Sequence, residues 1–221
     1  MRRSRSIVVV ALVTALTAFA PAGRADAAVC PGTVGYFPDV PATQPFCYEI
    51  SLVTTSFSFM HGYPDGTFRP GAAMSRQAVA STITALYRES DEIVPECEVM
   101  PFPDVPLDHP FCEQIQHVKN LGLMKAYGDG TFRPANAATR QSMIVLLYRS
   151  REEPLGPDPA CTEAPFPDVP ITNAFCGEIA WAQANGITEG YSDGTFRPAQ
   201  VVTRQAFSYF VVHTIMIGPH P

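Results

Sequence analysis

The chain has 221 residues, 46% of them hydrophobic, and carries a formal net charge of −6. An acidic chain has no general attraction for nucleic acid or an anionic surface, so any anion that it binds must be held by a few local donors. The length suffices to bury a core, and the 22 prolines mark many boundaries between short elements.

Residues 1–27 have the pattern of a secretory signal peptide. Three arginines within the first five residues precede an apolar run over 7–20, and a small-residue stretch ends at Ala27. The run is shorter than the roughly 20 residues that a membrane-spanning helix needs, so we expect cleavage after Ala27 and no membrane span thereafter. Cleavage removes four arginines and one aspartate, which changes the charge from −6 to −9. Acylation of Cys30, as in a lipoprotein, is an alternative.

The six cysteines of an exported chain indicate disulfides. The simplest connectivity pairs them in chain order, although links between distant pairs stay open. Each bridge would close a loop of about 16 residues, worth about 3 kcal/mol in the chain-entropy model. These gaps are too wide for the ligand pairs of a zinc site. The predicted pairs are Cys30 with Cys47, Cys97 with Cys112, and Cys161 with Cys176.

A nine-residue phrase occurs three times, as GYPDGTFRP at 62–70, AYGDGTFRP at 126–134 and GYSDGTFRP at 190–198. Around it each copy has the same order: a cysteine, Phe-Pro-Asp-Val-Pro, Phe-Cys, a helix, the Asp-Gly turn, Ser/Thr-Arg-Gln and a second helix. We therefore predict three tandem repeats, each with two helices joined by one tight turn, and proline-rich linkers at 90–95 and 152–159. The predicted repeats span residues 28–91, 92–156 and 157–221.

The first helix of each repeat is predicted over 46–57, 111–121 and 175–185, with Ile50, Ile115 and Ile179 facing inward. Gly122 and Gly186 follow the second and third of these helices, where glycine favours a left-handed C-cap. Ser58 takes that place in copy one, so we expect a less sharp ending there.

The Asp-Gly turn has a physical basis, because aspartate hydrogen-bonds the backbone ahead of it and glycine tolerates positive φ. The phenylalanine after each turn is expected to re-enter the core. One aspartate per loop does not fit a calcium loop. The next residue is an arginine, which we interpret as structural and bonded to local carbonyls or to the repeated Asp39, Asp104 and Asp168. These turn arginines are Arg69, Arg133 and Arg197.

The second helix of each repeat is expected to start after Ser75, Thr139 or Thr203, all good N-caps. Residues 143–148 and 207–212 are nearly all apolar, which predicts helices buried on more than one side. A single short repeat cannot provide such burial, so the copies should pack around a common centre.

In this order, and three times over, these motifs resemble S-layer homology domains, the modules that fasten exported proteins to bacterial cell walls. The resemblance implies a mainly α-helical fold, a pseudo-threefold spindle with a central helical bundle and three prongs, here stabilised by disulfides. It also implies non-covalent binding of a secondary cell-wall polysaccharide, often a pyruvylated one, or a peptidoglycan-linked glycan, in grooves between the prongs at the surface of a bacterium.

The family's Thr-Arg-Ala-Glu motif places its arginine on Arg76, Arg140 and Arg204, which we call the helix-start arginines. A planar fork of donors at a helix N-terminus suits an acidic sugar substituent. Alternatively, these arginines solvate the helix start or pair with an aspartate. The motif's glutamate is replaced by Ala78, Ser142 or Ala206, which predicts loss of the reciprocal half of the capping box.

Two further sets are candidate ligand contacts. The first comprises Gln77, Gln141 and Gln205, one place before the missing glutamates. The second comprises the tyrosines before each turn, which either stack on a sugar face or pack against the turn. These repeat tyrosines are Tyr63, Tyr127 and Tyr191.

No catalytic pattern is evident in the chain. The five histidines show no metal spacing, and no nucleophile elbow or carboxylate pair stands out. We therefore predict no enzyme, cofactor or metal, and a wall-binding module that makes up the whole mature protein and anchors a surface-protein partner or coats the wall. The alternative is a secreted, disulfide-stabilised interaction scaffold that has lost polysaccharide binding. Met74 and Ser75 make copy one the candidate for a degenerate site.

Overall fold

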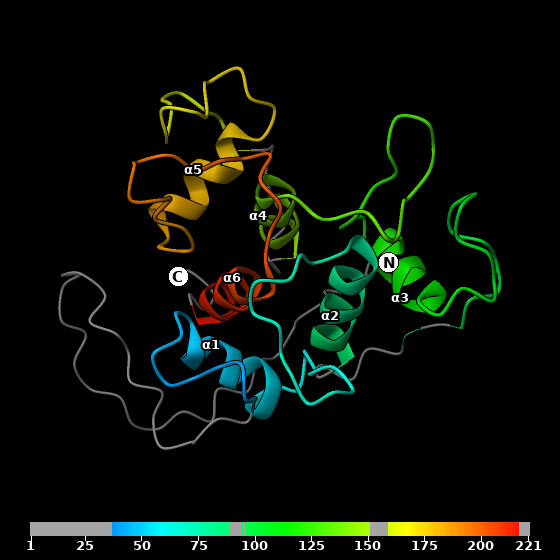
Figure 1. Cartoon of the computed structure of the whole chain (residues 1–221). Helices are drawn as coiled ribbons and strands as arrows, with labels where there is room; N and C mark the ends of the chain where they lie inside the picture. The colour runs from blue at the N-terminus through cyan, green and yellow to red at the C-terminus, as the bar shows by residue number, and fades with distance from the viewer. Residues whose placement is uncertain (1–36, 89–93, 95, 151–158, 217–221) are drawn as a thin grey trace.

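The computed structural model describes residues 37–88, 94, 96–150 and 159–216 (Figure 1). The described part is mainly helical, as predicted, and it contains isolated β-bridges but no strand. The predicted signal peptide, Cys30 and nearly all of the two linkers lie outside the described residues. The helices are α1 (Cys47–Ser51), the π-helical turn η1 (Leu52–Ser56), α2 (Arg76–Arg88), α3 (Cys112–Asn120), α4 (Arg140–Arg149), α5 (Cys176–Ala184) and α6 (Arg204–Met216).

Helices pack in pairs that combine two different repeats. Helix α2 packs on α3, α4 on α5, and α6 on α1 (Figure 1). The second helix of each repeat therefore lies against the first helix of the next repeat, and that of the third repeat lies against the first helix of the first. Within the described ranges, the two helices of one repeat do not pack on each other. We call these pairs prong 1–2 (α2 and α3), prong 2–3 (α4 and α5) and prong 3–1 (α6 and α1).

Backbone hydrogen bonds close the three repeats into a ring. The residue two positions before each helix-start arginine donates its backbone N–H to the carbonyl of the equivalent residue in another repeat. Met74 donates to Val202 (3.0 Å), Val202 to Ala138 (2.9 Å) and Ala138 to Met74 (2.8 Å). The cycle of three bonds returns to its starting residue, so the chain has pseudo-threefold symmetry about this point.

The apolar second helices are buried as expected. All of residues 143–148 in α4 are buried, and α4 packs directly on α6. Helix α2 reaches the end of α4 through Tyr87, whose hydroxyl donates to the carbonyl of Ser150 (3.3 Å). The inward-facing isoleucines and the phenylalanines of the turns belong to one core cluster that includes all three repeats. These core residues are Ile50, Ile115, Ile179, Phe68, Phe132 and Phe196, each at most 1% exposed.

Copy one contains an extra residue in its first helix. Tyr63 follows Phe46 by 17 residues, whereas Tyr127 follows Phe111 by 16. The extra residue is taken up by η1, because a π-helical turn holds one more residue than an α-helical turn. Ser58 has φ 54°, close to the left-handed values of Gly122 and Gly186. The ending of this helix therefore differs from the others through its wider turn, and not through its cap.

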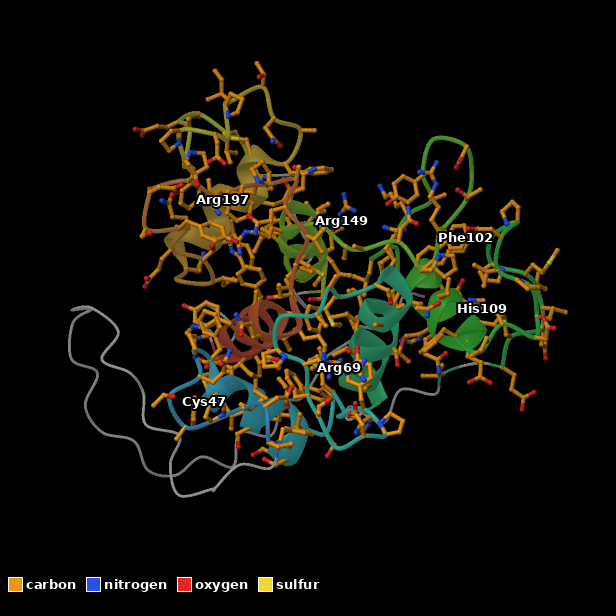
Figure 2. The ribbon with its side chains drawn as sticks, viewed as in Figure 1. Cys47, Arg69, Phe102, His109, Arg149 and Arg197 are labelled. Carbon is orange, nitrogen blue, oxygen red and sulfur yellow. A yellow bond between two sulfur atoms is a disulfide. The ribbon has the colours of Figure 1, made fainter. Side chains whose placement is uncertain are left out.

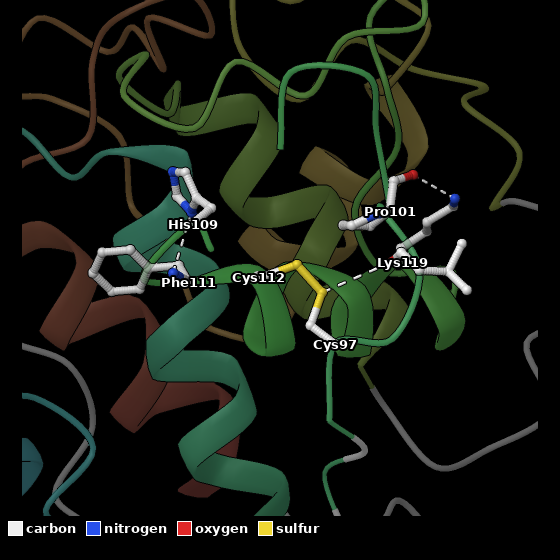
Figure 3. Close-up of a disulfide and its surroundings, with 7 residues drawn as sticks. Cys97, Pro101, His109, Phe111, Cys112 and Lys119 are labelled. Atoms are coloured by element: carbon white, nitrogen blue, oxygen red, sulfur yellow. Dashed lines mark hydrogen bonds between the residues drawn. A yellow bond between two sulfur atoms is a disulfide. The ribbon is translucent and has the colours of Figure 1, made fainter. Parts of the chain in front are cut away.

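Disulfides tie the start of a repeat to its first helix. Cys97 bonds to Cys112 at the beginning of α3 (Figure 3), and Cys161 bonds to Cys176 at the beginning of α5. These two predicted pairs are confirmed. Lys119, near the end of α3, donates to the carbonyl of Pro101 and holds the same segment at a second point (Figure 3).

Candidate functional site

The Asp-Gly turn is a self-contained polar unit. In repeat 2 the Asp129 carboxylate accepts from the backbone N–H (3.0 Å) and hydroxyl (2.6 Å) of Thr131 and from the guanidinium of Arg133 (2.8 Å). The Thr131 hydroxyl and Arg133 hold the pKa of Asp129 well below its usual range. Repeats 1 and 3 repeat these bonds through Asp65 and Asp193.

A second aspartate fixes the backbone that leaves the turn. The Asp104 carboxylate accepts from the backbone N–H groups of Phe132 (2.7 Å) and Arg133 (2.6 Å), and Arg133 has φ 56°. The turn arginine is therefore structural, as interpreted, but its guanidinium pairs with Asp129, whereas Asp104 binds main chain. Asp39 and Asp168 act in the same way in their repeats. Arg69 and Arg197 stand on separate parts of the molecule (Figure 2).

Each helix-start arginine reaches into the following repeat. The Nε of Arg76 donates to the carbonyl of Phe132 (2.7 Å), and its Nη2 donates to that of Lys125 (2.8 Å). Arg140 donates in the same way to the Phe196 carbonyl (2.8 Å) and more weakly to the Thr188 hydroxyl (3.5 Å).

The arginine of the third repeat completes the cycle. Arg204 donates to the carbonyls of Phe68 and His61 in the first repeat, both at 2.7 Å. The three side chains thus clasp neighbouring repeats, and they neither simply solvate the helix start nor pair with an aspartate. The repeat spacing could not reveal this role, because the acceptors are backbone carbonyls, which every residue type carries.

The free N–H groups at the helix starts are already used. Arg76 N donates to the carbonyl of Asn136 (2.8 Å) and Gln77 N to that of Pro134 (2.9 Å). The third, from Ala78, binds the Ser75 hydroxyl (3.3 Å), so the predicted N-cap is confirmed. The same three bonds occur at α4 and α6. These three amides already have acceptors within the protein, although the helix dipole still favours an anion there.

The capping box survives in one repeat. The Ser142 hydroxyl accepts from the backbone N–H of Thr139 (3.0 Å), while the Thr139 hydroxyl accepts from Ser142 N. The predicted loss of the reciprocal bond is therefore wrong for α4, because serine can replace the glutamate as acceptor.

Each repeat tyrosine ring lies close to two guanidinium groups. The Arg133 guanidinium carbon is 4.2 Å from the centre of the Tyr127 ring, and that of Arg76 is 4.9 Å from it. The turn arginine comes from the tyrosine's own repeat and the helix-start arginine from the repeat before. We call these groups site 1–2 (Arg76, Tyr127, Arg133), site 2–3 (Arg140, Tyr191, Arg197) and site 3–1 (Arg204, Tyr63, Arg69).

None of the helix-start arginines forms a direct ion pair with a carboxylate in the described residues, although Asp104, Asp168 and Asp39 attract them from a longer distance. Arg140 is 6% exposed and Arg204 is 9% exposed, and burial lowers the pKa of both and of Arg76. Arginine nevertheless stays protonated in proteins. Of the five N–H groups that a guanidinium offers, two are used in each clasp, so three remain. Each site can therefore accept an anionic group beside an aromatic ring.

The candidate glutamines are placed differently at the three sites. The Gln205 side chain accepts from the Nε2 of Gln44 (2.7 Å), which ties α6 to the segment before α1. Gln77 and Gln141 are half-buried, and their side chains have no hydrogen-bond partner among the described residues.

Within the described ranges, no helix is both long and apolar enough to cross a membrane, and no group of three potential metal ligands is found.

The model of the S-layer homology domain matches three segments of the chain, residues 36–80, 101–144 and 165–208, which together exceed half of its length. Cell surface glycoprotein 1 of Acetivibrio thermocellus is 28% identical over 171 residues, which make up 73% of this chain and 7% of that protein. The cellulosome-anchoring protein of the same organism is 27% identical over 168 residues, 73% of this chain and 36% of that protein.

A surface layer protein of Brevibacillus choshinensis is 29% identical over 105 residues, 48% of this chain and 9% of that protein. The chain thus spans far less than two thirds of each of these relatives. Three domain matches in tandem, on repeats that close into one ring, show that this chain belongs to the S-layer homology domain family.

Proposed function

We propose that this protein is exported, with the signal peptide ending at Ala27, and that it binds an acidic cell-wall polysaccharide non-covalently at the surface of a bacterium. The helix-start arginines would contact acidic substituents, with Gln77, Gln141 and Gln205 beside them, and the repeat tyrosines would border the same sites. The domain boundaries at residues 28–91, 92–156 and 157–221 belong to this proposal.

The observation that carries the proposal is that the three arginines have no direct carboxylate partner among the described residues. A buried guanidinium bonded only to neutral oxygens loses hydration energy that a carboxylate partner would return. An anionic ligand supplies that missing partner and can use two of the remaining N–H groups at once. The family membership and the names of the relatives support a wall-anchoring role.

The same sites support binding without catalysis. Guanidinium, amide and phenol groups recognise an acidic sugar, and the two arginines and one tyrosine of each site include no carboxylate or imidazole that would activate the phenol as a nucleophile. We therefore expect no soluble fragments to be released when the protein is incubated with purified cell walls.

Co-sedimentation with wall sacculi of the producing bacterium tests the proposal. Half of the sacculi are first extracted to remove anionic polymer. Wild-type protein should sediment with intact sacculi and stay in solution with extracted ones. The triple variant Arg76→Gln/Arg140→Gln/Arg204→Gln should bind at least tenfold more weakly, because each glutamine can still donate to one carbonyl but carries no charge.

Arg149→Gln is the matched control, because it removes one arginine from the end of α4, away from the three sites. Circular dichroism checks that both variants fold. A folded triple variant that sediments like the wild type contradicts polysaccharide binding through these arginines. It would favour the alternative of a protein-interaction scaffold.

A further inference from the structure

The three sites share one architecture but differ in the residue at their edge. The position two residues before the repeat tyrosine is Lys125 at site 1–2, Glu189 at site 2–3 and His61 at site 3–1. The backbone at this position touches sites 1–2 and 3–1, because the carbonyls of Lys125 and His61 accept from the helix-start arginines, and at site 2–3 Arg140 bonds to Thr188, the residue before Glu189. All three side chains are exposed.

Exposure also distinguishes the sites. Arg140 and Arg204 are buried, whereas Arg76 is only partly buried. Tyr127 is 37% exposed, and Tyr63 and Tyr191 are less so. The Arg140 guanidinium carbon also lies 5.2 Å from the ring of Phe210, a third aromatic neighbour after Tyr191 and Phe196. Site 1–2 is therefore the most open and site 2–3 the most enclosed.

The glutamines add a third difference. Gln205 at site 3–1 is already bonded to Gln44, whereas Gln77 at site 1–2 and Gln141 at site 2–3 have no side-chain partner among the described residues, so this difference sets site 3–1 apart from the other two. An incoming sugar can thus bind the Gln77 amide without breaking a protein hydrogen bond.

From these observations we infer that the sites are not equivalent: site 1–2 is the primary site for an anionic glycan, Lys125 strengthens it, and Glu189 makes site 2–3 the weakest. This inference rests on the proposed function. It reverses the expectation that copy one is degenerate. Ser75 caps α2 at 3.3 Å, the same distance as the threonines, and Arg76 makes the same clasp as its counterparts.

The charge at the edge acts on a ligand through solvent. Exposed pairs of charges contribute a few tenths to about 1 kcal/mol, so reversing the charge at one edge should change affinity about fivefold at low salt. Salt screens such pairs over roughly 10 Å at 0.1 M, so the effect should shrink as salt is added.

NMR titration of the full mature protein with the polymer extracted from sacculi tests the ranking. The Nε–H group of each helix-start arginine is hydrogen-bonded at 2.7 or 2.8 Å, so it exchanges slowly and reports on its own site. The Arg76 signal should saturate at several-fold lower polymer concentration than the Arg140 signal.

Charge-swap variants locate the cause. Lys125→Glu should raise the half-saturating concentration at site 1–2 about fivefold and leave site 2–3 unchanged, and Glu189→Lys should lower it at site 2–3. Glu163→Lys adds the same charge as Glu189→Lys on an exposed residue outside the three sites and should change neither.

The possible failures are distinguishable. If the polymer shifts none of the three arginine signals, both the proposed function and the ranking are wrong. If the three signals saturate at the same polymer concentration, or if the Arg140 signal saturates first, the ranking alone is wrong and polysaccharide binding still holds. Equal effects of Glu189→Lys and Glu163→Lys would show that overall charge, and not the edge of site 2–3, sets the affinity.

Discussion

At the scale of single residues, one carboxylate in each repeat fixes the backbone conformation of the chain as it leaves the turn. Asp104 accepts two backbone N–H groups, and one belongs to Arg133, whose left-handed φ is uncommon for a residue with a side chain. The carbonyl of Phe132 then accepts from Arg76, and the carbonyls of Pro134 and Asn136 accept from the first two N–H groups of α2. The aspartate therefore supports the neighbouring repeat as well as its own.

Replacing Asp104 with alanine should lower the free energy of unfolding by about 2 kcal/mol or more, because both N–H groups lose their acceptor and that of Phe132 is buried. Asp104→Asn keeps one acceptor oxygen and should lose less. Urea denaturation measures both. Equal losses in the two variants would indicate that the charge, and not the pair of hydrogen bonds, is what matters.

The sequence predicted the residue types of this unit but not all of its bonds. The Asp-Gly turn, the buried phenylalanine and the structural arginine follow from local chemistry. The partner of Arg133 was open between several oxygens, because sequence distance does not say which carboxylate the left-handed backbone brings near. The acceptors of Arg76 were invisible for a simpler reason: they are main-chain carbonyls of residues 56 and 49 positions away.

At the scale of helices, the insertion in copy one shows how the fold tolerates an irregular repeat. The π-helical turn absorbs one residue, so Phe59 and Met60 still reach the core as Leu123 and Met124 do in repeat 2. Apolar spacing predicted the first helices correctly. It could not predict their partners, since an apolar stripe shows that a face is buried without showing which helix covers it.

Deleting the exposed Thr55 should convert η1 into a regular α-helical turn and leave the fold intact, because copy one then has the length of the others. Deleting the exposed Asn120 from α3 should be far more damaging, since it rotates the residues that follow by about 100° relative to the core. Thermal melts followed by circular dichroism compare the two. A loss in the Thr55 deletion as large as that in the Asn120 deletion contradicts this account of η1.

At the scale of the molecule, stability is shared around the ring. Every prong combines two repeats, and the cycle through Met74, Val202 and Ala138 needs all three. The sequence predicted three copies around a common centre from the apolar second helices. It did not show the exchange of helix partners, because neither the repeat spacing nor the apolar pattern distinguishes packing within a repeat from packing between repeats.

Removing residues 157–221 should abolish cooperative thermal unfolding, because α4 loses α5 and α1 loses α6. The truncated chain keeps the Cys97–Cys112 disulfide, so any loss is not due to that bond. Circular dichroism and size-exclusion chromatography test this. A monomeric truncated chain with a sharp transition near that of the full protein contradicts the shared ring.

Because the arginine clasp recurs at each junction, no repeat is the natural beginning of the structure. The described residues begin shortly before α1 and end with α6, and these two helices form prong 3–1, where His213 of α6 is 3.4 Å from Glu49 of α1. A circular permutant that joins these ends with a linker and opens between repeats 1 and 2 would preserve every cross-junction bond. Only the position of the two chain termini in the ring would change.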